Sequence, residues 1–328
     1  MLLVLQSSHL NCKSILKGLQ VRLLKSRLAW AGRAIRRWYD SRMHPHWDTL
    51  IVDLDGTLLN KDGEVSDRNM RAYNEVCQQG IEVIIATGRC YAECSHIMDC
   101  LGHTGVSICA GGSTLHNESG QTIQASHLPF AIVEEVAKAL MENNHRCLLL
   151  KDNRSSDVHY VLVGNSELHD ASKWWFDVHD ISYLEVNEID DDPWKETTVR
   201  AGAVACESML DPIARNLETQ LGDRATMQHW SAVTSSEATG SVTHLLEVFG
   251  RNVSKWSMLE TYFNGSVNKD RVVAIGDGLN DVELLKGAGL SIAMENATEF
   301  VKSHAQYVCG HHEQDGFASA VESWILSA

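Results

Sequence analysis

The chain has 328 residues, of which 44% are hydrophobic, and a formal net charge of −15. This composition allows a sizeable core in one large domain or two ordinary ones, and it excludes global disorder. Residues 1–42 hold nine Lys or Arg and one acid, so the chain from Met43 onward holds 19 basic and 42 acidic residues, a net charge of −23. The strongly acidic chain from Met43 onward argues against a nucleic-acid partner, because phosphate contacts require clustered Lys and Arg.

Residues 1–43 are predicted to form a basic N-terminal extension. The segment is poor in acids and dotted with Leu, Ile and Trp, which is typical of a targeting segment or a partner-binding helix; a misassigned start upstream of Met43 is the other interpretation. No apolar run reaches the ~18 residues of a membrane span. Nine cysteines match no disulfide framework. We expect a cytoplasmic protein without a membrane span, with organelle targeting by residues 1–42 as the alternative.

Alternating strand and helix patterns begin at Thr49 and resume in the last third of the chain. Ser66 is the expected N-cap of a helix over Asp67–Gln79, and Gly80 is its expected terminator. Continuous apolar runs between helices predict a parallel sheet covered on both faces. The expected strands are Thr49–Leu54, Ile81–Ala86, Val106–Ala110, Val272–Ile275 and Leu290–Ala293, and the later helices are Lys255–Phe263 and Asp281–Lys286.

The middle of the chain has shorter elements and more turns. The expected elements are the helices Ile132–Asn143 and Asp211–Gln220 and the strands Cys147–Leu150, Val158–Val163 and Val199–Cys206. A sheet that is interrupted by such a unit and then completed predicts an α/β fold with a Rossmann-like parallel-sheet core and an inserted α/β cap. The predicted core is residues 44–117 and 236–328, and the predicted cap is residues 118–235.

Polar residues follow several of the apolar strands directly. Asp53 and Asp55 end the first strand, Thr87 the second, and Asp277 the strand Val272–Ile275. In open parallel sheets ligands bind beyond the carboxyl ends of the strands, so these residues can converge. Each motif alone is also typical of an ordinary turn. All three in this order, each after an apolar strand, predict one site for phosphate and metal.

The two acids at the first strand end suit two separate tasks. Asp53 is the predicted nucleophile, because a carboxylate can attack phosphorus and divide a hard hydrolysis into two steps. Asp55 is the predicted proton shuttle, as general acid and then general base. Gly56 lets backbone N–H groups approach the phosphate. The other predicted phosphate contacts are Thr87, Gly88, Lys255 and Asn280.

A divalent cation is predicted beside these acids. Asp277, the Asp53 carboxylate and the Asp55 main-chain carbonyl offer the hard oxygen ligands that Mg²⁺ prefers. Asp281 is expected to lie behind them and to orient a metal-bound water. The ion would shield the anionic nucleophile from an anionic substrate.

These motifs resemble those of the haloacid dehalogenase superfamily, and specifically its Cof-type branch. The similar stretches are Asp53-Leu54-Asp55-Gly56-Thr57-Leu58, Ala86-Thr87-Gly88-Arg89, Gly276-Asp277-Gly278-Leu279-Asn280-Asp281, Ile292-Ala293-Met294-Glu295-Asn296-Ala297 and Asp315-Gly316. The resemblance covers about residues 49–112 and 242–324. It implies a Rossmann-like core, Mg²⁺, an aspartyl-phosphate intermediate and a cap that sets substrate choice.

Two positions depart from the branch's pattern. Lys255 is present, but Trp256 follows it in place of a small residue, which is expected to narrow the pocket or reposition the helix. Lys269 is the fallback lysine. Gly112 stands where the branch usually has a polar substrate contact, and Asn296 is a further expected substrate contact.

We therefore predict a Mg²⁺-dependent phosphatase for a small phosphorylated metabolite, such as a sugar phosphate. A phosphomutase or phosphotransferase of the same superfamily is the nearest alternative, and a non-catalytic metabolite-binding protein is the second. A homodimer is left open. Arg89 is expected to form an ion pair rather than touch substrate. Trp174-Trp175-Phe176 is expected in the cap core or a dimer patch, and a grip on an aromatic or sugar substrate is the alternative interpretation.

Overall fold

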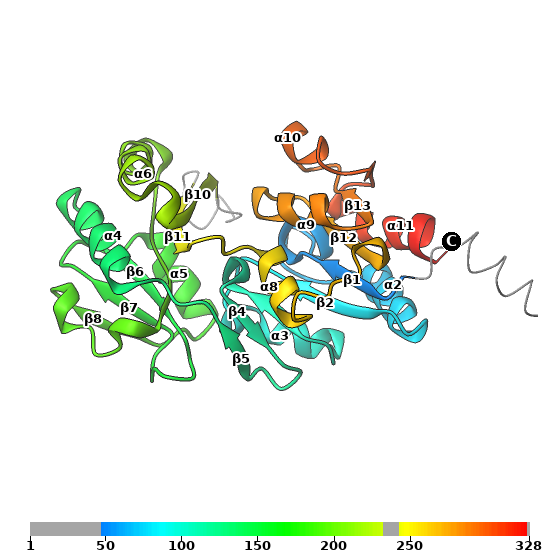
Figure 1. Ribbon diagram of the computed structural model, residues 1–328, viewed down its shortest axis with the longest axis horizontal. Helices are drawn as coiled ribbons and strands as arrows, with labels where there is room; N and C mark the ends of the chain where they lie inside the picture. Colours follow the sequence, from blue (N-terminus) through cyan, green and yellow to red (C-terminus); the bar gives the residue numbers. More distant parts are fainter. Residues whose placement is uncertain (1–46, 232–242, 327–328) are drawn as a thin grey trace, which may run out of the picture. The chain divides into compact units, whose positions relative to one another are not determined.

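The computed structural model describes residues 47–231 and 243–326, so the predicted extension 1–43 lies outside the described residues. Two sheets form in this range (Figure 1). The first, the core sheet, contains β1 (Thr49–Val52), β2 (Glu82–Ala86), β3 (Ser107–Cys109), β4 (Thr114–His116), β5 (Thr122–Ala125), β12 (Val272–Gly276), β13 (Leu290–Ala293) and β14 (Tyr307–Val308). Their order is β14-β13-β12-β1-β2-β3-β4-β5, parallel from β14 to β3 and antiparallel from there to β5.

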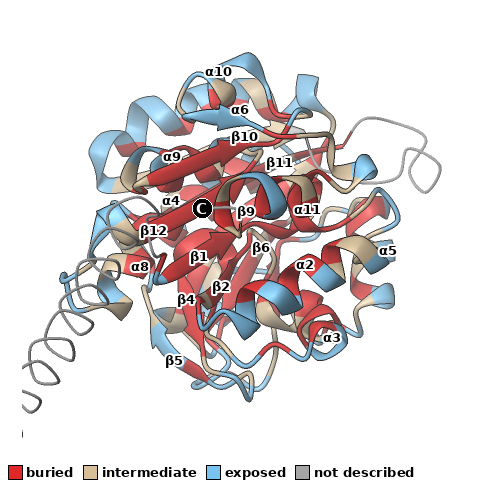
Figure 2. Ribbon diagram, turned by 90° about the vertical axis from the view of Figure 1, so that its right-hand side faces the viewer, coloured by how far each residue is buried: buried red, intermediate tan, exposed pale blue. Residues whose placement is uncertain are grey.

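The core sheet buries both of its faces, which explains its continuous apolar strands. Along β1, Leu50 and Val52 pack into one hydrophobic cluster and Ile51 into another, because successive side chains point to opposite faces. The first cluster includes residues of α2 (Asp67–Gln78), α3 (Tyr91–Leu101) and α11 (Gly316–Ala320), and the second includes residues of α8 (Lys255–Tyr262), α9 (Val282–Gly287) and α10 (Glu299–Lys302). In Figure 2, β1 and β12 are buried throughout, whereas α2 also exposes residues.

The second sheet, the cap sheet, is mostly antiparallel. It contains β6 (Cys147–Lys151), β7 (Tyr160–Val163), β8 (Tyr183–Val186), β9 (Thr198–Ala205), β10 (Ala225–Ser231) and β11 (His244–Gly250), in the order β10-β11-β9-β6-β7-β8. Only β7 and β8 pair in parallel within the described part of this sheet. Residues of α4 (Phe130–Glu142) and α6 (Glu207–Leu221) share one hydrophobic cluster with the strands, and α5 (Asp170–Val178) contributes Phe176 to another.

The predicted α/β fold with a parallel core sheet is confirmed. Ser66 caps α2 as expected, since its hydroxyl accepts a hydrogen bond from the backbone N–H of Asn69 at 3.1 Å. Gly80 follows the helix with a φ of +78°. Sequence patterns missed the four edge strands β5, β8, β10 and β14, and also the interior strands β4 and β11. β5, β8 and β14 are half-buried or exposed over much of their length, so their apolar signal is weak.

The chain passes from the core sheet to the cap sheet, and back again, at later residues than the predicted domain boundaries. β5 belongs to the core sheet although it lies beyond residue 117, and β11 belongs to the cap sheet although it lies beyond residue 235. β11 pairs with β9 and β10 over most of its length, so its apolar pattern serves the cap. No helix in the described ranges is long and apolar enough to cross a membrane.

Candidate active site

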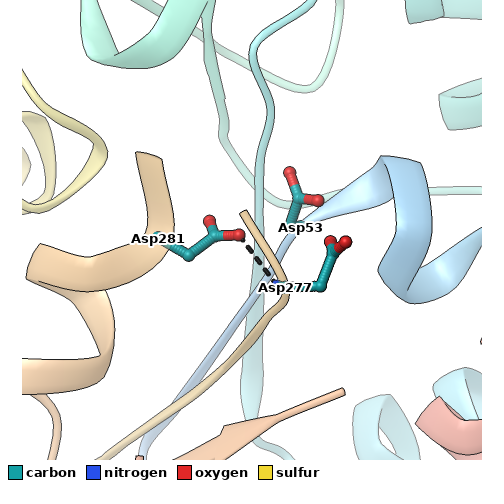
Figure 3. A group of neighbouring side chains, drawn as sticks. All are labelled: Asp53, Asp277 and Asp281. Carbon is teal, nitrogen blue, oxygen red and sulfur yellow. Dashed lines mark hydrogen bonds between the residues drawn. The ribbon is translucent and has the colours of Figure 1, made fainter. Parts of the chain in front are cut away.

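Three carboxylates meet at the carboxyl edge of the core sheet. Asp53 follows β1, Asp277 follows β12, and Asp281 precedes α9. One oxygen from each lies within 4.8 Å of the others, and Figure 3 shows the three side chains gathered at this edge. Asp53 and Asp281 are buried, and Asp277 is partly buried. The topology thus assembles a cluster whose members are far apart in sequence.

Lys255 is the cation nearest to this cluster. Its side chain is fully buried, and its Nζ donates to Asp53 Oδ1 at 2.6 Å and to Asp281 Oδ1 at 2.7 Å. Burial disfavours the charged ammonium, but Asp281 and Asp53 outweigh it and raise the pKa of Lys255. Ser254 holds the start of α8 in place by accepting from the backbone N–H of Ser257. The predicted lysine therefore reaches the predicted nucleophile.

The acids outnumber the cation, and that imbalance suits a divalent metal. Burial, only partly offset by Lys255, raises the pKa of Asp53 well above its ordinary value. Burial and then Asp281 raise the pKa of Asp277 to about 7. Three carboxylates beside one ammonium leave negative charge uncompensated, and hard oxygens are the ligands that Mg²⁺ takes. The residues fit a bound Mg²⁺.

Asp281 acts from behind the other two acids. Its Oδ2 accepts from the backbone N–H of Asp277 at 3.0 Å (Figure 3) and from that of Gly278 at 2.9 Å, while its Oδ1 accepts from Lys255. Both oxygens are thus engaged in ordering the loop after β12. This arrangement is consistent with the prediction that Asp281 lies behind the metal ligands and does not coordinate the metal directly.

The Asp277 carboxylate is held on both sides. Thr57 Oγ1 donates to its Oδ1 at 2.9 Å, and Asn296 Nδ2 donates to its Oδ2 at 3.0 Å. Asn296 also donates to the carbonyl of Gly56 at 2.8 Å. Gly56 has a φ of +74°, and a Cβ there would overlap the Asp277 carboxylate, so only glycine fits. Asn296 was predicted as a substrate contact, and the structure places it against Asp277 instead.

Asp55 is paired with an arginine. Arg89 Nε donates to Asp55 Oδ2 at 2.7 Å and Nη2 to Oδ1 at 2.5 Å, a bidentate contact. The Arg89 guanidinium carbon lies 4.9 Å from the ring centroid of Trp175 in α5. The expected ion pair of Arg89 is therefore present, and its partner is the predicted proton shuttle.

A cavity of about 530 Å³ opens between this edge and the cap sheet. Asp53, Asp55, Asp277, Gly88 and Asn280 line it from the core side. The cap residues that line it include Trp175, Arg200, Trp230, Thr243, Leu245 and Glu247.

Residues 50–321 match the model of the haloacid dehalogenase-like hydrolases. The chain belongs to this family. It is 27% identical to the 5-amino-6-(5-phospho-D-ribitylamino)uracil phosphatase of Bacillus subtilis, over 84% of this chain and 95% of that protein. It is 26% identical to the HMP-PP phosphatase of Serratia proteamaculans, over 84% of this chain and 94% of that protein. The predicted Cof-type membership and the predicted enzyme class, a phosphoric monoester hydrolase, are confirmed.

A solved structure shows the same fold. The haloacid dehalogenase-like hydrolase from Bacteroides thetaiotaomicron superposes with a TM-score of 0.68 at 24% identity, covering 84% of this chain and 98% of that one. Both the core sheet and the cap sheet fall within the family's matched range.

Seven predicted site residues of this haloacid dehalogenase-like chain do not line the cavity: Gly56, Thr87, Gly112, Lys255, Trp256, Asp281 and Asn296. Thr87 is fully buried, and its Oγ1 accepts from the backbone N–H of Arg89 at 3.1 Å. Trp256 packs in the core against Gly287 of α9, so the expectation that it narrows the pocket is wrong. Gly112 lies against the backbone of Ser254, where a Cβ would overlap, so it permits close approach rather than contacting substrate.

The fallback lysine is not at the site. Lys269 is 56% exposed at its side chain and lies 3.5 Å from Glu260. Sequence reasoning gave no role to Thr57, although its place directly after Asp55 and Gly56 was a usable signal. Apart from Trp175 and Phe176, which belong to the aromatic cluster singled out above, it also missed the cap residues of the cavity, which carry no motif.

Replacing Asn296 by Ala is expected to weaken Mg²⁺ binding about 10- to 100-fold, because outer contacts orient metal-ligating carboxylates. The measurement is a Mg²⁺ titration of the purified protein by calorimetry. Asn264→Ala, in the turn after α8, is the matched control and should bind Mg²⁺ as the wild type does. Unchanged affinity in Asn296→Ala would show that Asp277 needs no such support.

Proposed function

We propose that this chain is a Mg²⁺-dependent phosphatase that hydrolyses a small phosphorylated metabolite through an aspartyl-phosphate on Asp53. One observation carries the proposal. Asp53 lies 2.6 Å from the buried Lys255 and lines the same cavity as Asp55 and Asp277. A nucleophile, a second acid and a third carboxylate thus line one space large enough for a metabolite, and a buried cation contacts the nucleophile.

In the first step an Asp53 oxygen forms a bond to phosphorus and the ester P–O bond breaks. Asp55 gives its proton to the leaving oxygen, so the product departs as an alcohol. Lys255 beside the nucleophile offsets negative charge, as positioned cations do in phosphoryl transfer. Gly88 and Asn280 line the cavity where the phosphoryl oxygens would lie.

In the second step water attacks phosphorus, the Asp55 carboxylate accepts the water's proton, and the bond to Asp53 breaks. The bidentate contact with Arg89 suits the carboxylate form of Asp55, which is the base required at this stage. The first step needs the acid form, so the Arg89 contact must loosen before the leaving group is protonated.

Asp53 and Asp277 would hold the metal through their carboxylates, together with the main-chain carbonyl of Asp55. When bound, Mg²⁺ supplies charge neutralisation between the anionic nucleophile and the anionic substrate. Two relatives at 26–27% identity are named as phosphatases, and their names describe small phosphorylated metabolites, which supports the proposed substrate class.

A phosphate-release assay tests the proposal. With Mg²⁺ present, the purified protein should release inorganic phosphate and alcohol from small phosphate esters in equal amounts, and EDTA should stop the reaction. Transfer of the phosphoryl group to a second hydroxyl without phosphate release would indicate a phosphomutase or phosphotransferase. Binding without turnover would indicate a metabolite-binding protein.

Mg²⁺ is expected to raise the Tm of the wild type, because a ligand that binds only the folded state stabilises it by about 2.7 kcal/mol at 100 times its Kd. For a chain of this size that corresponds to roughly 5–10 °C. Asp277→Asn should lose most of the shift, whereas Asp270→Asn, at an exposed position before β12, should keep it. A thermal-shift series over Mg²⁺ concentration measures this, and an equal shift in Asp277→Asn would remove Asp277 from the metal site.

A further inference from the structure

The side chains on the cap side of the cavity indicate which kind of leaving group fits there. On β11, Leu246 and Val248 pack into the cluster shared with α4 and α6. Alternation along a strand therefore turns Leu245 and Glu247 to the opposite face, and both line the cavity. Trp230 of β10 stands opposite Leu245 in the register, so it belongs to the same face.

Two indoles reach the loop between β2 and α3, on the core side. The Cζ2 atom of Trp230 lies 4.0 Å from the position that a Cβ would take at Gly88. Trp175 lies against the next residue, with its ring centroid 4.9 Å from the Arg89 guanidinium carbon. Both indoles line the cavity that contains Asp53. A substrate whose phosphate meets Asp53 thus has aromatic surface close to its leaving group.

The charged groups on this wall are already partnered. Arg200 Nη1 donates to the Gly88 carbonyl at 2.9 Å and lies 2.6 Å from Glu247 Oε1. Arg200 Nη2 donates to the Tyr160 hydroxyl at 2.7 Å, and that hydroxyl donates to Glu93 Oε1 at 3.1 Å. Within this network, Arg200, Tyr160 and Glu247 therefore have few donors or acceptors left for a leaving group.

Three residues that line the cavity have a buried side-chain atom without a hydrogen-bond partner among the described residues: Ser172, His229 and Thr243. Thr243 is 1% exposed and lines the cavity just before β11. Its Oγ1 has no hydrogen-bond partner among the described residues. A buried hydroxyl without a partner is costly, so a ligand that supplies one is favoured at this position.

We propose that the cavity selects phosphate esters whose leaving group is a planar aromatic ring, with Trp230 and Trp175 as the specificity-determining residues and Thr243 as a hydrogen-bonding position. This inference rests on the proposed phosphatase function and narrows its substrate class away from sugar phosphates. Aromatic rings gain from contact with the indoles. Sugar hydroxyls that face Leu148, Val204 and Leu245 would find apolar side chains, which offer no hydrogen bonds.

The test compares pyridoxine 5′-phosphate with glucose 6-phosphate. Both carry the phosphate on a CH₂–O group attached to a six-membered ring, but one ring is aromatic and the other is a polyol. The wild type with Mg²⁺ should show a kcat/KM for pyridoxine 5′-phosphate on the order of 100-fold higher. A preference for glucose 6-phosphate would overturn the inference while leaving the phosphatase function in place.

Variants of cap residues test which side chains produce the preference for the aromatic ester. Trp230→Leu should lower kcat/KM for pyridoxine 5′-phosphate about 10-fold, mainly through KM, and reduce the preference over glucose 6-phosphate. Thr243→Val should lower it by about 3- to 10-fold. Trp174→Leu is the matched control, because Trp174 lies on α5 beside Trp175, is 37% exposed and does not line the cavity.

The outcomes distinguish a failure of the aromatic preference from a failure of the phosphatase function. An unchanged preference in Trp230→Leu, or an equal change in Trp174→Leu, would refute the role of the cap wall. Acetyl phosphate serves as a ringless probe of phosphoryl transfer itself. If the wild type with Mg²⁺ hydrolyses neither acetyl phosphate nor the two larger esters, the phosphatase function fails and the inference fails with it.

Discussion

Asp53→Asn is expected to lose at least ~10⁴-fold in kcat for any phosphate ester, the scale seen when a catalytic nucleophile is removed. An amide oxygen is a poor nucleophile, so the acyl-phosphate step cannot occur. The replacement also leaves the neighbouring Lys255 and Asp281 in place. The loss should therefore appear in kcat rather than in substrate binding.

The folded state should tolerate this change. Burial raises the pKa of Asp53, which means that the ionised carboxylate is disfavoured where it stands. A neutral amide of the same shape removes that unfavourable charge, so the Tm of Asp53→Asn should equal or exceed the wild-type Tm without metal.

Asp48→Asn is the matched control for the same strand. Asp48 lies just before β1, is exposed and pairs with Arg271, far from the cavity. It should keep full activity. Wild-type turnover in Asp53→Asn, verified by mass spectrometry to exclude conversion to Asp, would rule out the covalent mechanism.

The convergence of the acids could be predicted from the sequence because it rests on local pattern and topology. An apolar run marks each buried strand, and the carboxyl ends of parallel strands meet at one edge. These two rules were enough to predict that Asp53 and Asp277 lie close together. Lys255 followed from its place at a helix start, and Lys255 does reach Asp53.

The side-chain partners could not be predicted in the same way. The bonds from Asn296 to Asp277 and from Arg89 to Asp55 depend on rotamers and distances that no sequence spacing encodes. Trp256 shows the same limit. Adjacent residues on a helix point about 100° apart, so Lys255 faces the site while Trp256 faces α9.

The cap cavity is harder still, because its residues come from separate strands that carry no motif. Trp230 and Leu245 are neighbours only through the β10–β11 register. Sequence patterns missed β10, and they placed the β11 residues in the core. The class of reaction can therefore be predicted from the core motifs, whereas predicting which substrates are selected requires the three-dimensional structure.

Lys255→Met is expected to affect stability and activity together. Lys255 is fully buried between Asp53 and Asp281, so its removal leaves two carboxylates without their cation. Breaking a buried pair in this way costs roughly 3–5 kcal/mol. The Tm without metal should fall by roughly 10 °C, and kcat/KM should fall at least ~100-fold because charge on the phosphoryl group is no longer offset.

Mg²⁺ should restore part of the stability of Lys255→Met but little of its activity. A divalent cation at the same acids replaces the lost positive charge in the folded state, whereas the contact that Lys255 makes at the nucleophile stays absent. Thermal shifts with and without Mg²⁺, paired with phosphate-release rates, separate the two effects. Lys269→Met is the matched control, since that exposed lysine lies away from the cavity and should change neither quantity. A Lys255→Met protein with wild-type Tm and turnover would mean that the buried lysine neither stabilises the acid cluster nor assists the reaction.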